Sequence, residues 1–182
     1  MIALSTIFKY LSLIGSFAVV GTLLAMGFLL LDSHGKLSTS AKKLRTMLWI
    51  SGLTWTIGSI GVILFTLATI LDQPLSVALD STVLRSFITQ ITLGQYLLFQ
   101  TLVALFITFA SIRVNKILTV ISLLILTLIG LVAPVFQSHS ASGGSHALAI
   151  GSLVIHVVAL SLWVGGVITL AILEPEDRPV AV

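Results

Sequence analysis

The chain has 182 residues, of which 57% are apolar and only 8% charged, and its mean hydropathy is +1.19. Soluble domains carry about 45–50% apolar and about 25% charged residues, so a water-soluble globular protein is excluded and an all-α, polytopic bundle of transmembrane helices is predicted. The net charge of +3 comes from a few basic residues near short loops, which favours no nucleic-acid partner. Cysteine is absent, which excludes disulfides and thiolate sites.

Apolar runs long enough to span a bilayer recur along the chain. A spanning helix needs about 20 mostly apolar residues, and about five such runs are predicted. They lie near residues 7–31, 47–71, 92–113, 115–135 and 147–173. The first run is too long for a signal peptide and has no basic leader or cleavage motif, so we expect it to stay as a helix. Residues 1–173 are expected to form one domain, and 174–182 a short tail.

The basic residues predict the orientation, because short cytoplasmic loops are enriched in Lys and Arg. The third and fourth runs are separated only by RVNK, which predicts a tight hairpin. The loop from Phe136 to His146 carries no Lys or Arg, and Lys9 is an exception at the outer side. The N-terminus is therefore predicted outside and the C-terminus in the cytoplasm. The cytoplasmic loops carry Lys36, Lys42, Lys43, Arg45, Arg113 and Lys116.

The second loop has its own helical pattern. Its apolar residues recur every four positions, and Asp72 and Pro74 favour a helix start. We predict a helix over about residues 74–90 that lies on the outer membrane surface; a lid over an outer-face site is the alternative. The recurring residues are Leu75, Leu79, Val83, Phe87 and Ile91.

Small residues on the first two runs are typical of closely packed membrane helices. Packing is therefore the expected role of Gly15, Gly21, Ala25, Gly52, Thr56, Gly58 and Gly61.

Catalytic motifs are absent from the sequence. It has no phosphate-binding loop, nucleophile elbow or HExxH zinc motif, so we expect no enzyme. The carboxylates all fall at helix ends or in loops, which disfavours a proton relay through the bilayer. They are Asp32, Asp72, Asp80, Glu174, Glu176 and Asp177.

The four histidines are the main candidates for chemistry. His34 falls in a basic loop, where a solvated side chain is expected. His139 and His146 flank the flexible segment SASGGS, which could bring both imidazoles to one point. Paired imidazoles suit copper or zinc, so both residues are candidate metal ligands at the outer face.

His156 lies inside the last apolar run, about nine residues or roughly 14 Å from its start. An ionisable group at this depth is a functional candidate by default, and a hydrogen bond to a neighbouring Ser or Thr is the alternative. His146 and His156 would be about 15 Å and 80° apart on one helix, so they would not share an ion. Trp163 falls almost on the face of His156, and Gly165 and Gly166 allow close approach.

The run SHSASGGSHALAIGSLVIHVVALSLWVGGVITLAI resembles the signature of the copper resistance D (CopD) family of bacterial membrane proteins. In that family a small-residue and His segment precedes a helix that bears a His and then Trp-Val-Gly-Gly. The matching residues are His139, His146, His156, Trp163, Gly165 and Gly166. The segment TVLRSFITQITLGQYLLFQ is similar to an earlier family region, with Gly94 at the small position.

The resemblance is greatest to versions fused to a cytochrome oxidase assembly (CtaG-like) domain, and this chain looks like their N-terminal part. It departs from the pattern at Ser138, where Gly is usual, and family members continue with further helices. The resemblance implies copper import or delivery at the bacterial cytoplasmic (plasma) membrane. It also implies as partners the lipid bilayer, further CopD- or CtaG-like helices, or a periplasmic copper chaperone.

The sequence leaves several readings open. His139 and His146 are expected to capture copper and His156 to pass it deeper, with Met26 or Trp163 as supporting residues. Cu(I), Cu(II) and zinc all remain compatible with imidazole ligands. One alternative is a haem protein that uses His156 as an axial ligand, although haem binding of this kind would call for two facing histidines. The other is a membrane scaffold for oxidase assembly.

Overall fold

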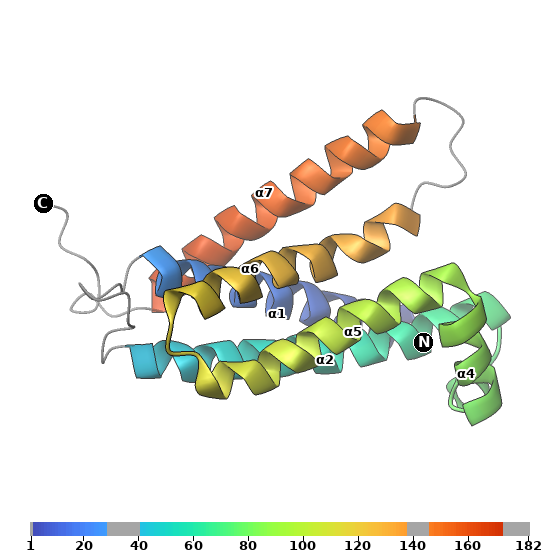
Figure 1. Cartoon of the computed structure of the whole chain (residues 1–182). Helices are drawn as coiled ribbons and strands as arrows, with labels where there is room; N and C mark the ends of the chain where they lie inside the picture. Colours follow the sequence, from blue (N-terminus) through green and yellow to red (C-terminus); the bar gives the residue numbers. More distant parts are fainter. Residues whose placement is uncertain (1, 29–40, 138–145, 173–182) are drawn as a thin grey trace, which may run out of the picture.

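The computed structural model describes residues 2–28, 41–137 and 146–172, and within these ranges the chain is helical with no β-strand. Five described helices are long and apolar enough to cross a membrane, which confirms the predicted class. Figure 1 shows these long helices side by side, with a shorter helix across one end. The elements are α1 (Ile2–Phe28), α2 (Ala41–Leu71), α3 (Leu75–Ala78), α4 (Ser81–Gln90), α5 (Thr92–Ala110), η1 (Ser111–Arg113), α6 (Ile117–Val132), η2 (Ala133–Gln137) and α7 (His146–Ile172).

The predicted spans agree with these helices apart from their ends. α1 begins five residues and α2 six residues before the predicted apolar run, and the added residues of α2 include Lys42, Lys43 and Arg45. The predicted tight connection is present as η1 followed by a short link to α6. Arg45 of α2 donates a hydrogen bond to the side-chain amide oxygen Oδ1 of Asn115 in this link, which connects the start of α2 to the α5–α6 hairpin.

α1 and α2 pack through glycines, as the small residues predict. A Cβ on Gly15 would lie 2.5 Å from the Trp55 backbone nitrogen, and one on Gly58 would lie 2.4 Å from that of Ser12. The backbones thus meet too closely for a side chain at either glycine. Ser12 and Ser59 lie in the same contact, with their hydroxyl oxygens 3.2 Å apart. Without a hydrophobic force between helices in lipid, such close packing and polar contact hold the bundle together.

The segment between α2 and α5 forms two helices rather than the single predicted helix. The chain breaks after α3 because the Asp80 carboxylate accepts hydrogen bonds from the backbone of Thr82 and Val83, at 2.9 and 3.1 Å, and caps α4. Phe87 anchors α4 in a cluster beside α2 and α5, but Leu79 is 58% exposed. The four-residue periodicity therefore identified the anchor at Phe87 but not the break.

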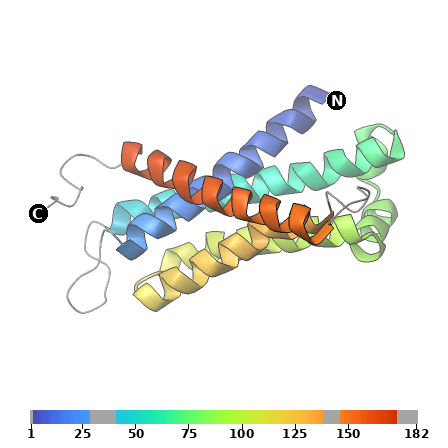
Figure 2. The ribbon, with the colours of Figure 1, turned by 90° about the horizontal axis from the view of Figure 1, so that it is seen from above.

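α7 is the least buried span. Only 17% of its most apolar window is buried, against 39–50% for the other four spans. Its firm contact is with α1, where a Cβ on Gly21 would lie 1.8 Å from the Gly165 carbonyl oxygen. Figure 1 shows α7 diverging from the other helices toward its N-terminal end, and Figure 2 shows it crossing α1. α7 is therefore a peripheral helix held mainly along one side.

Candidate functional site

The structure describes the positions of two of the four histidines. His34 and His139 lie outside the described residues. His146 is the first residue of α7, although its side chain is not described, and His156 is an exposed residue within the same helix. The predicted proximity of His139 and His146 therefore stays a prediction.

α7 is one continuous helix from His146 to Ile172. His146 and His156 are ten positions apart, which corresponds to a rise of about 15 Å and a rotation of about 80° between their side chains. Two imidazoles at that separation cannot bind the same ion. A metal ion that binds at each histidine of α7 in turn would therefore occupy two separate positions along the helix.

His156 lies on the side of α7 that faces away from α1. Nine residues separate it from Gly165, which at 100° per residue places the two on opposite faces of the helix. Trp163 follows seven residues after His156, so the two share a face within about 20°. Trp163 is 70% exposed, and a Cβ on Gly166 would meet nothing within 4 Å. We call this surface the open face of α7; it carries Ser152, His156, Ala159, Trp163, Gly166 and Leu170.

The two glycines after Trp163 have different roles. Gly165 is buried against Phe17 and Gly21 of α1, where a side chain would clash with backbone. Gly166 has no such neighbour among the described residues. The close approach expected for both glycines is therefore made by Gly165 alone.

Met26 is not brought to His156. Its side chain is fully buried in the main core cluster, which includes Leu23, Leu44 and Leu48. Met26 lies five residues beyond the Gly21–Gly165 crossing and His156 nine residues before it, on helices that run in the same direction. The two residues are therefore roughly 20 Å apart along the bundle.

The described residues do not assemble a metal centre by themselves. Within them, no group of three or more His, Cys, Asp or Glu side chains comes close enough to hold an ion. The imidazole chemistry suits copper, but the ligand set predicted at the outer end depends on His139 and on the His146 side chain. Copper is cargo in this hypothesis and not a built-in cofactor.

An apolar pocket that sequence patterns did not indicate opens at the end of the bundle where α7 begins. Its volume is about 550 Å³, and aromatic residues of α5 and η2 line it together with Gln95. Tyr96 and Phe136 stack there with ring centroids 6.4 Å apart. Forty residues separate these two rings in the sequence, so no local pattern could have paired them. Phe136 immediately precedes the segment that carries His139.

Comparison with known proteins gives one family. Residues 1–148 match the family model described as copper resistance protein D-like, N-terminal domain. No curated protein and no solved structure matches the chain. The matched region ends in the first turn of α7, so His156 and Trp163 lie beyond it.

Proposed function

The chain belongs to the family of copper resistance protein D-like N-terminal domains, and on that premise we propose that it handles copper in a bacterial cytoplasmic membrane, as an import or delivery component and not as an enzyme. His139 and His146 capture the ion at the outer end. His156 is a second position deeper in the bilayer. Imidazole binds copper in either oxidation state, so these histidines do not select between Cu(I) and Cu(II).

The position of His156 carries the proposal. It lies inside the span Leu148–Ile172, ten residues from the start of α7. A side chain that ionises is costly in hydrocarbon, and such residues mark ion or substrate paths more often than lipid-facing surfaces. The separation of about 15 Å from His146 suits a path of two steps along one helix. Trp163 on the same face would shield the second position from lipid.

The first experiment measures copper bound per chain in detergent, for the natural protein and for a variant with His139, His146 and His156 all changed to Ala. His34→Ala is the matched control, because it removes an imidazole from the basic loop. Tight binding that survives in the control and is lost in the triple variant is expected. Equal binding in all three proteins, or binding in none, would refute copper handling through these residues.

Single substitutions then separate the two steps. His139→Ala and His146→Ala should each weaken capture by about tenfold or more, since each removes one of two ligands. His156→Ala should leave capture unchanged and slow the movement of copper into liposomes that contain the protein. If His156→Ala weakens capture as strongly as His146→Ala, the two-step path is wrong.

A scaffold role in oxidase assembly is a second candidate, and the open face of α7 favours it. Gly166 of this face is a described glycine at which an added Cβ would meet nothing within 4 Å. Glycine lowers helix stability, so its presence on an uncovered face suits the approach of another helix. In this case Gly166→Leu would abolish oxidase assembly, and the variant with His139, His146 and His156 changed to Ala would not.

A haem role makes a separate prediction. It requires an absorbance band of bound haem in the purified protein that disappears in His156→Ala. A haem-free protein that still binds copper would exclude it.

A further inference from the structure

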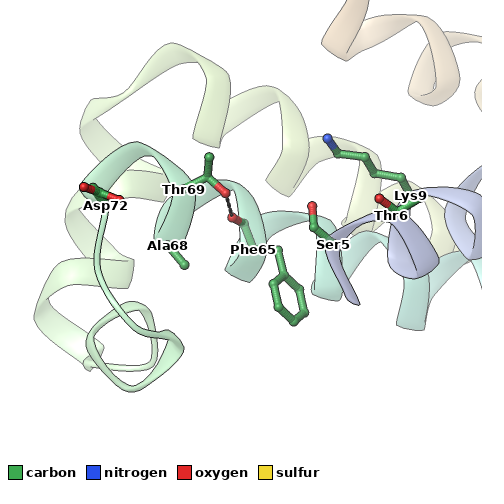
Figure 3. Close-up of a pocket in the computed structure, with 7 residues that line it drawn as sticks. All are labelled: Ser5, Thr6, Lys9, Phe65, Ala68, Thr69 and Asp72. Atoms are coloured by element: carbon green, nitrogen blue, oxygen red, sulfur yellow. Dashed lines mark hydrogen bonds between the residues drawn. The ribbon is translucent and has the colours of Figure 1, made fainter. Parts of the chain in front are cut away.

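A pocket lies between the first turns of α1 and the end of α2, apart from the histidines of α7. Its volume is about 350 Å³, within the range of small-ligand sites. Figure 3 shows the Lys9 side chain reaching from α1 toward the end of α2 that carries Asp72. The pocket therefore offers a positive and a negative group at the same end of the bundle.

The pocket has an apolar floor and a polar rim. Phe65 and Ala68 of α2 are almost fully buried beneath it, and Phe65 stacks on Phe8 with ring centroids 5.4 Å apart. Ser5 and Thr6 contribute the rim on α1. A ligand that binds here would place charged groups at the rim and carbon atoms over the floor.

Asp72 occupies a position where an aspartate is locally unfavourable. The backbone of Gln73 donates to the Ala68 carbonyl and that of Asp72 to the Thr69 carbonyl, at 3.1 and 3.3 Å, which is the hydrogen-bond pattern of a Schellman helix end. Asp72 therefore adopts a left-handed conformation with φ 50°, where glycine is usual. Its negative charge also lies at the negative end of the α2 dipole. Residues that break two local rules are expected at functional positions.

Lys9 is also unusual in its place. It lies within the candidate span Ala3–Gly27, about 10 Å from the start of α1. Most described basic residues lie at the other end of the bundle, where Lys43 and Arg113 are found, and Arg85 of α4 is the exception. Neither the Lys9 side chain nor the Asp72 carboxylate has a hydrogen bond or ion pair within the described part of the chain. Both charges are thus free to meet a ligand.

We propose that this pocket binds a phosphoethanolamine group, with the phosphate at Lys9 and the rim hydroxyls and the ammonium at Asp72. A simple anion would be repelled by Asp72 and a metal cation by Lys9, whereas a zwitterion satisfies both charges. An ammonium that carries hydrogens can donate charge-assisted hydrogen bonds to a carboxylate, which a quaternary ammonium cannot. The group can come from the lipid phosphatidylethanolamine or from free phosphoethanolamine.

The experiment measures retention of defined lipids on the full chain by native mass spectrometry, with phosphatidylethanolamine, phosphatidylglycerol and phosphatidylcholine compared. Preferential retention of phosphatidylethanolamine is expected. Lys9→Gln should reduce retention of the ethanolamine and glycerol lipids by about tenfold, since both phosphates lose a charged donor. Asp72→Asn should reduce only the preference for ethanolamine, because Asn also accepts the left-handed conformation.

Two matched controls keep the test specific. Lys116→Gln removes a lysine at the opposite end of the bundle, and Asp80→Asn removes a carboxylate from the same end while Asn still caps α4. Equal retention of the three lipids by the natural protein would overturn the proposal. So would Lys9→Gln and Asp72→Asn variants that behave as their controls do.

Free phosphoethanolamine distinguishes the two sources. If it displaces the retained lipid, the lipid is the ligand and its head group is what the pocket recognises. If it binds to the natural protein but not to Lys9→Gln, and no lipid is retained, the ligand is the free solute.

Thermal unfolding separates binding from structure. Asp72→Gly relieves the left-handed backbone and the unfavourable charge, so without lipid it should unfold at a higher temperature than the natural protein. It should also lose the added stability that phosphatidylethanolamine gives. A lower unfolding temperature without lipid would show that Asp72 has a structural role and would refute the proposal.

Discussion

Gly21 of α1 and Gly165 of α7 meet backbone to backbone. A Cβ added to Gly165 would lie 2.2 Å from the Phe17 carbonyl oxygen, and one added to Gly21 would lie 1.8 Å from the Gly165 carbonyl oxygen. Distances this short cannot be relieved by a rotamer change, because the atoms involved belong to the main chain. The contact therefore sets how closely α7 approaches the bundle.

Substitution of the two neighbouring glycines of α7 should give opposite results. Gly165→Leu should destabilise the protein by about 1–3 kcal/mol or more, because the helices must separate. Gly166→Leu should change stability little, since its Cβ position is empty. Unfolding in a graded denaturing detergent measures both. Equal losses would mean that α7 is covered on both faces.

Two interhelical hydroxyl pairs should differ in strength. Thr56 and Thr108 lie 3.4 Å apart, but each hydroxyl already donates to a carbonyl of its own helix, at 2.8 Å in both cases. Ser12 and Ser59 lie 3.2 Å apart, and the pair has a hydroxyl hydrogen available for the contact. A double-mutant cycle to Ala should give a coupling of about 0.6 kcal/mol for the serines. A cycle to Val should give almost none for the threonines. A larger coupling for the threonines would contradict this assignment.

The Asp80 cap should stabilise the surface segment. Asp80→Ala removes the acceptor of two backbone hydrogen bonds and should cost about 1 kcal/mol, whereas Asp80→Asn should cost little. Amide hydrogen exchange over residues 81–84 is the sensitive measurement. Protection that survives in Asp80→Ala would show that packing of Phe87 alone holds α4.

Met26 should contribute to the stability of the fold and not to copper binding. Met26→Leu conserves volume and should leave copper binding unchanged, because the residue is buried roughly 20 Å from His156. Met26→Ala should cost about 2–5 kcal/mol as a core truncation. Loss of copper from Met26→Leu with normal stability would assign the thioether to the metal path.

The sequence predicted the helices well because hydrocarbon thickness constrains length and composition directly. It also predicted that Gly15, Gly21, Gly52 and Gly58 serve packing, since small residues in spans have few other uses. The family resemblance is confirmed over residues 1–148.

Long-range geometry was beyond prediction. The pairing of Tyr96 with Phe136 and the distance of Met26 from His156 depend on how helices far apart in sequence are rotated and stacked. The break at Asp80 was not predicted. In the sequence, an aspartate that caps a new helix looks the same as an aspartate on the polar face of a continuous helix. The position of Lys9 beside a pocket could not be predicted, because the sequence does not show which residues of α2 lie next to it.

The Gly21–Gly165 contact also bears on biosynthesis. Of the described spans, α1 is synthesised first and α7 last. The surface around Phe17 and Gly21 therefore stays uncovered by α7 while three other spans are synthesised. During that interval the narrow surface is open to lipid or to chaperones that bind exposed spans. Docking of α7 then covers this surface. The surface around Gly21 admits a close backbone approach, and Gly165 is the residue of α7 that makes this approach without a side chain in the way.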